Sequence, residues 1–153
     1  MRKIISKVIY VSMPFSLMAC NLNPTQNAAV DTYSGPTDST YNICYESIMD
    51  RDSVFFNALI YGDSIKGSLG YKLYEKDQNN GSVLGTIHGD TIRALYTFMS
   101  EGQESTREII FLQEDKQLVE GYGTMEERNG RTMFKHNIAF RFDGIRLKEV
   151  NCK

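Results

Sequence analysis

Three carboxylates and one guanidinium crowd into a short polar stretch, and they are the first residues to consider for chemistry. Glu101, Glu104 and Glu108 follow Ser100 within a few positions, and Arg107 lies among them. General acid–base catalysis needs two carboxyl groups held in different environments across a cleft. This spacing does not require a cleft, since a charged hairpin loop that leads into a strand explains the same residues. We therefore expect no enzyme, and a hydrolase that uses these glutamates is the least favoured alternative.

Arg107 is the member of this stretch that is best suited to bind a ligand. Its planar guanidinium can grip an anionic group with several donors at once. Tyr96, on the apolar face of the preceding segment, is the second candidate ligand-binding residue. A polar turn that binds nothing is the competing interpretation.

The chain carries little else that could support catalysis or hold a metal. His88 and His136 are its only histidines, and neither has a cysteine or carboxylate beside it at a zinc-site spacing. It contains no Gly-x-Ser-x-Gly nucleophile motif and no glycine-rich phosphate loop. We expect neither a metal nor a cofactor.

The N-terminus has the pattern of an export signal. Arg2, Lys3 and Lys7 precede an apolar run of about eleven residues that ends at Met18, and small Ala19 follows. A basic start, a short apolar run and a small residue are typical of a secretory signal. The run is shorter than the about 20 residues of a membrane-spanning helix. We predict that residues 1–19 are a signal peptide.

The residues at the predicted cut site narrow the class. Leu17-Met18-Ala19-Cys20 resembles the lipobox of bacterial lipoproteins. This resemblance implies that the Cys20 thiol is lipidated, that the signal is removed before it, and that acyl chains such as palmitate anchor the protein. No acidic cluster follows Cys20, so we expect the outer membrane, with the domain facing the periplasm.

The composition of the chain after residue 19 limits its possible partners and its domain organisation. Without residues 1–19, 14 Lys and Arg remain against 19 Asp and Glu, a net charge of about −5. That balance argues against nucleic acid as a partner. Residues 20–40 are polar and contain two prolines, so we predict a flexible tether behind the lipidated cysteine. Residues 41–153 then form one domain, which we expect to be a monomer.

Two cysteines lie at opposite ends of this domain. Cys44 is near its start and Cys152 is one residue from its end. An even pair in an oxidising compartment is expected to form a disulfide, which would join the first and last strands. The alternative is a pair of buried free thiols.

Period-2 alternation dominates the domain and predicts β-strands. The expected inward face carries large apolar residues: Ile65, Leu69, Tyr71, Ile92, Tyr96 and Phe98. Turn signals separate about eight strands, predicted at roughly 41–49, 53–61, 64–74, 82–88, 91–100, 105–113, 117–124 and 131–142, with a short last strand at 145–151. The turn signals include Asn79-Asn80-Gly81 and Glu101-Gly102.

A weak internal repeat indicates how these strands assemble. Tyr61–Lys66 matches His88–Arg93 at an offset of 27 residues, which is one hairpin. Repeated hairpins with one apolar face bury that face when the sheet closes on itself. We predict an all-β, antiparallel up-and-down meander, closed as a barrel or strongly curved, and lipocalin- or calycin-like. Glycines inside the strands, such as Gly67 and Gly85, either permit bends or clear room for a ligand.

The domain as a whole resembles a family of uncharacterised envelope lipoproteins of Gram-negative bacteria. The resemblance rests on the stretches Gly70–Gly81, Gly89–Ile92, Tyr96–Gly102 and Ser105–Glu108, and on the early and late cysteines. The resemblance implies the predicted fold and the predicted location in the envelope, and it implies no activity. The leading hypothesis is a non-enzymatic domain that binds an envelope protein or other partner, and the second is a lipocalin-like carrier of a small apolar ligand.

Overall fold

The computed structural model describes residues 39–76 and 78–152. The predicted signal peptide, Cys20 and the predicted tether up to residue 38 lie outside these residues. These residues form ten strands: β1 (Thr40–Met49), β2 (Asp52–Tyr61), β3 (Ser64–Lys72), β4 (Asn79–His88), β5 (Thr91–Ser100), β6 (Gln103–Glu114), β7 (Gln117–Gly121), β8 (Met125–Arg128), β9 (Arg131–Phe134) and β10 (Arg146–Glu149). The described residues include no helix long and apolar enough to cross a membrane.

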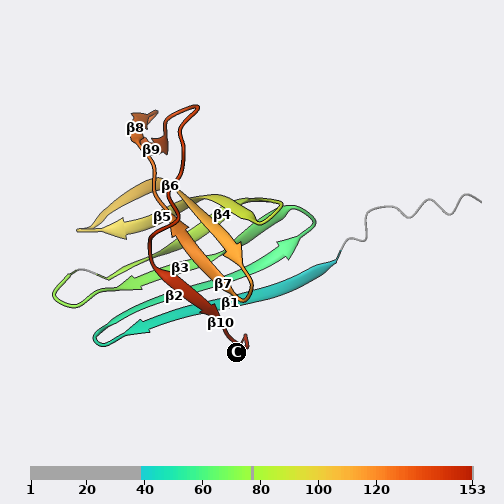
Figure 1. Cartoon of the computed structure of the whole chain (residues 1–153). Coiled ribbons are helices and arrows are strands. Elements are labelled where there is room, and N and C mark those ends of the chain that lie inside the picture. The colour runs from blue at the N-terminus through green and yellow to red at the C-terminus, as the bar shows by residue number, and fades with distance from the viewer. Residues whose placement is uncertain (1–38, 77, 153) are drawn as a thin grey trace, which may run out of the picture. The chain divides into compact units, whose positions relative to one another are not determined.

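Eight of these strands form a closed antiparallel barrel. The strands β1 to β6 follow one another as hairpins, β7 pairs with β6, and β10 lies between β7 and β1 (Figure 1). The pairing of β5 with β6 closes the ring. This confirms the predicted all-β meander of about eight strands, and the architecture is consistent with a lipocalin-like barrel.

The alternation in the sequence fills the barrel interior. The expected inward residues Ile65, Leu69 and Ile92 are at most 1% exposed, and Tyr71 and Tyr96 are also buried. Phe98 is only partly buried, because it lies near the end of β5. Other strands add the remaining core side chains, among them Val54, Phe56, Ile60, Val83, Phe111, Leu118 and Leu147.

The strand glycines bring neighbouring backbones together. A Cβ on Gly67 would collide with the backbone of Ala58 on the facing strand, and one on Gly85 would collide with Ala94. Glycine is therefore required where the chains approach closely. At these two positions the close approach of the facing strand, rather than room for a ligand, explains the glycine.

A disulfide joins the two ends of the domain, as predicted. Cys44 in β1 is bonded to Cys152, with Cα atoms 5.3 Å apart and a sequence separation of 108. The amide of Val150 donates a hydrogen bond of 2.8 Å to the carbonyl of Cys44. The cross-link and this hydrogen bond fix the chain end along β1.

Two sequence predictions about local structure were wrong. Asn79-Asn80-Gly81 begins β4 rather than forming a turn, and the turn precedes it, with Glu75 in a left-handed conformation. The strand predicted at 131–142 is only β9, and β8 and β9 form a hairpin outside the barrel wall. The segment after β9 keeps its alternation but has a turn at His136–Asn137.

That outer segment covers one side of the barrel. The rings of Phe134 and Phe140 are 4.9 Å apart, and Phe142 lies beside Gly121 at the end of β7. The side chain of Ile110, on the same outer face, also lies beside Gly121. Residues between β7 and β10 therefore shield the outside of β6 and β7 from solvent.

Candidate functional site

The structure does not gather the three candidate carboxylates. Glu101 lies in the turn between β5 and β6 with φ at 51°, and Glu104 lies on the exposed start of β6; both side chains are solvent-exposed. Glu108 is 8% exposed and lies under the outer segment. The predicted charged hairpin is present, and β6 begins at Gln103, two residues before the predicted start of that strand.

Glu108 connects the barrel wall to the outer hairpin. Its Oε1 accepts a hydrogen bond of 2.6 Å from Nε of Arg93, and its Oε2 accepts one of 2.9 Å from the backbone amide of Phe134. Burial would raise the pKa of Glu108, but these hydrogen bonds and the charges of Arg93 and Arg128 outweigh it. The pKa of Glu108 is therefore lower than its ordinary value.

The lowered pKa predicts a pH-dependent contribution to stability. Glu108 should stabilise the fold above its unfolded-state pKa of about 4.3, and the contribution should be lost as pH falls through the lower folded-state pKa. We expect Glu108→Gln to lower the free energy of unfolding by about 1–3 kcal/mol at pH 7. The loss should shrink toward pH 3, as measured by urea unfolding. Exposed Glu104→Gln is the control, and an equal loss for Glu108→Gln at both pH values would contradict the role of its charge.

Arg107 and Tyr96 meet inside the barrel wall. They are directly opposite each other in the pairing of β5 with β6. The guanidinium carbon of Arg107 lies 5.5 Å from the ring centre of Tyr71 and 5.6 Å from those of Tyr96 and Phe98. Its Nε is buried and has no hydrogen-bond partner, and none of the ion pairs between described side chains includes Arg107.

Glu120 is the site residue that the sequence reasoning missed. It is 6% exposed and accepts hydrogen bonds from the hydroxyls of Tyr71 at 2.8 Å and Tyr122 at 3.3 Å. The available signal was its position two residues after Leu118, which places both on the inner face of β7. A carboxylate at an inward position of a barrel strand is unusual enough to mark a site.

The tyrosines around these charges remain protonated donors. Burial raises the pKa of Tyr71, the neighbouring Glu120 charge raises it further, and Arg107 only partly opposes this. Burial likewise raises the pKa of Tyr96 to about 12 against the lowering effect of Arg107. The Tyr96 hydroxyl donates a hydrogen bond of 2.9 Å to the carbonyl of Asn79.

Arg107 and Glu120 line one small hollow in the barrel wall. The hollow has a volume of about 70 Å³. It lies at the end of β7, where the part of β6 before Ile110 is no longer paired with β7. We call it the wall hollow. Its lining consists of Arg107, Glu108, Ile109, Glu120, Gly121, Tyr122, Gly123, Met125 and Phe134. It offers a donor and a carboxylate acceptor, which suits binding of a small polar group.

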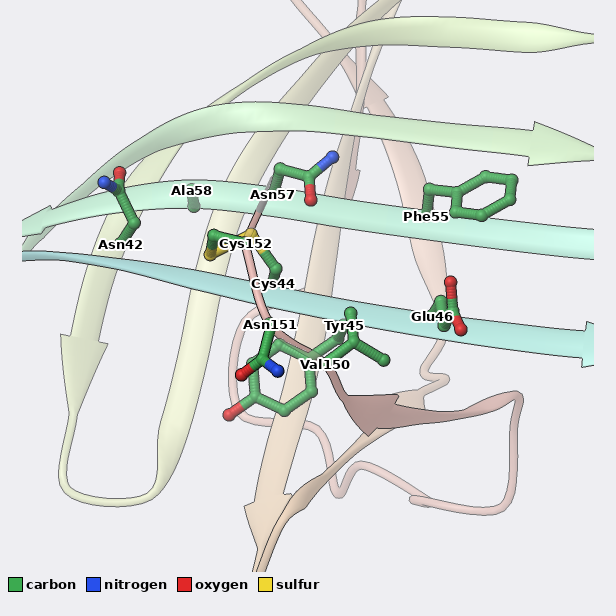
Figure 2. Close-up of a pocket in the computed structure, with 10 residues that line it drawn as sticks. All are labelled: Asn42, Cys44, Tyr45, Glu46, Phe55, Asn57, Ala58, Val150, Asn151 and Cys152. Carbon is green, nitrogen blue, oxygen red and sulfur yellow. A yellow bond between two sulfur atoms is a disulfide. The ribbon is translucent and has the colours of Figure 1, made fainter.

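A second, larger hollow lies beside the disulfide. Its volume is about 450 Å³. Figure 2 shows Asn42, Asn57 and Asn151 among its lining residues, together with the bond between Cys44 and Cys152. These three side chains are exposed, so water satisfies their hydrogen bonds. In the wall hollow, by contrast, Nε of Arg107 is buried and has no hydrogen-bond partner among the described residues, so we take this hollow as the candidate site.

The two histidines lie in separate surface contacts. His88 is exposed and its Nε2 lies 3.2 Å from Oγ1 of Thr86, whereas Nε2 of His136 accepts a hydrogen bond of 3.2 Å from Arg128. Within residues 39–76 and 78–152, no group of three or more His, Cys, Asp or Glu side chains is placed to hold a metal ion.

Comparisons with known proteins do not place the chain in a family, because no family model, curated protein or solved structure matches it.

Proposed function

We propose that this chain is a lipoprotein of the Gram-negative outer membrane whose domain faces the periplasm and acts as a binding module. The lipobox-like residues up to Cys20 and the resemblance to envelope lipoproteins support the anchor. The disulfide between Cys44 and Cys152 supports an oxidising compartment, where such bonds persist. The closed barrel is compatible with a lipocalin-like binding domain.

The proposed binding site is the wall hollow, and Arg107 is the residue that carries the proposal. A buried guanidinium nitrogen without a partner costs free energy unless an acceptor satisfies it. A ligand with an anionic or acceptor group supplies that acceptor. Since side chains fill the barrel core, a ligand at the barrel centre would have to displace them, whereas the wall hollow already has space.

The separation of the glutamates supports binding rather than hydrolysis. Glu101 and Glu104 face solvent, and Glu108 is engaged by Arg93 and Phe134. A pair of carboxyls facing each other across a substrate cleft would favour a hydrolase.

We expect Cys20→Ala to release the protein from membranes. The substitution removes the thiol that would carry the lipid, and several acyl chains are needed for stable anchoring. Fractionation of the envelope should find the variant in the soluble periplasmic fraction and the unaltered chain with the outer membrane. A variant that still sediments with membranes would show that the anchor lies elsewhere.

We expect Arg107→Gln to weaken binding of acetate, the smallest carboxylate probe, by at least about tenfold, since a charged hydrogen bond of about 1.5–3 kcal/mol is lost. Isothermal titration of the detergent-solubilised chain measures the affinity. Exposed Arg131→Gln is the matched control and should bind as the unaltered protein does. Equal acetate affinity in both variants, with both folded by circular dichroism, would remove Arg107 from the site.

A further inference from the structure

Opposite charges line the wall hollow without pairing with each other. Arg107 reaches it from β6 and Glu120 from β7, yet no ion pair between described side chains joins them. The carboxylate of Glu120 instead accepts hydrogen bonds from the hydroxyls of Tyr71 and Tyr122. Partly buried charges that remain apart are costly unless another group lies between them.

Arg107 and Glu120 both have unused hydrogen-bonding capacity. A carboxylate offers about four lone-pair sites, and among the described side chains two tyrosine hydroxyls donate to Glu120. Nε of Arg107 is an unused donor. A molecule that bridges them needs an acceptor at one end and a donor at the other.

Charge and size restrict that molecule further. Glu108 also lines the hollow, but Arg93 pairs with it. The remaining charges, positive on Arg107 and negative on Glu120, balance, so a dianion such as phosphate would be repelled by the acid and only half neutralised by the base. An apolar molecule would leave both charges unsatisfied. A hollow of about 70 Å³ has room for a group of only a few heavy atoms.

We infer that the wall hollow binds the α-amino carboxylate group of a small amino acid, with the ligand carboxylate on Arg107 and the ligand ammonium on Glu120. This inference rests on the proposed binding function and names its ligand class. A zwitterion matches the two charges in sign and adds no net charge. A larger amino acid would place only its amino and carboxyl groups in the hollow.

Matched fragments of one ligand test the inference. The probes are glycine, acetate, methylammonium and inorganic phosphate, at equal ionic strength, added to the 15N-labelled chain purified in detergent. The readout is the Nε–Hε resonance of Arg107, assigned by its disappearance in Arg107→Lys. We expect glycine to shift it with a dissociation constant at least tenfold below that of acetate, and methylammonium and phosphate to shift it little.

The Glu120→Gln variant tests the class of ligand independently of the binding site at Arg107. This variant should bring glycine to the affinity of acetate and leave acetate binding no weaker, while its backbone spectrum stays that of the folded protein. If glycine and acetate bind equally in the unaltered chain, or phosphate binds best, the amino-acid inference is wrong and the Arg107 site stands. If no probe moves the resonance, the hollow holds solvent only, and both the inference and the proposed site fail.

Discussion

Replacing Phe56 with alanine is expected to lower the free energy of unfolding by about 3–5 kcal/mol. The Phe56 side chain is 0% exposed, and its ring centre lies 5.5 Å from that of Phe111 across the barrel interior. Its removal leaves a cavity that the rigid barrel wall closes only in part. The loss is a large part of the about 5–15 kcal/mol that holds a typical domain folded.

The neighbouring residue provides a matched control on the same strand. Phe55 points outward and is 42% exposed, so Phe55→Ala should cost less than about 1 kcal/mol. Urea unfolding of both variants at pH 7 measures the difference. Similar midpoints, or a larger loss for Phe55→Ala, would mean that the inner and outer faces of β2 are assigned the wrong way round.

Breaking the disulfide is expected to have the second large effect. Cys152→Ala should lower the free energy of unfolding by about 2–5 kcal/mol, because the bond closes a loop of 108 residues and restricts the unfolded chain. Cys152 is the better choice than Cys44, since it is exposed and its truncation leaves no cavity.

Reduction of the unaltered chain provides the comparison. Protein reduced with dithiothreitol should unfold at the same urea concentration as Cys152→Ala, and the oxidised protein should need more. Mass analysis without reductant should find the two thiols joined. If the oxidised and reduced proteins have the same midpoint, the cross-link does not stabilise the domain.

The barrel was predictable from the sequence because its strands alternate and its turns are local. Ile65 and Ile92, which occupy equivalent positions in the repeat, are both fully buried. Alternation fixes which face is buried, and hairpin turns fix which strand is next.

The path after β7 was not predictable in the same way. A barrel strand was predicted at 131–142, and Ile138, Phe140 and Phe142 within it alternate as strand residues do. In the structure Ile138 and Phe140 pack against Gly123, just beyond the end of β7. Alternation shows that one side of an extended segment is buried, but it does not identify what covers that side.

The part of the candidate site that depends on a local hairpin was predictable, and the part that depends on closure of the barrel was not. Arg107 stood out as a guanidinium in a polar stretch, and its pairing with Tyr96 follows from the hairpin at Glu101–Gly102. Glu120 drew no attention because its partners Tyr71 and Tyr122 include a residue 49 positions away. Contacts made by closure of the sheet have no local sequence signal.

The most direct test of the account is the small-molecule content of the protein from its own host. The chain and its Arg107→Gln variant would be purified from the envelope, denatured, and the released molecules compared by mass spectrometry. We predict that the unaltered chain releases a small ligand with a carboxylate group, in amounts close to one per chain, and that the variant releases at least tenfold less. Identical release from both proteins, or none from either, would contradict a binding function centred on Arg107.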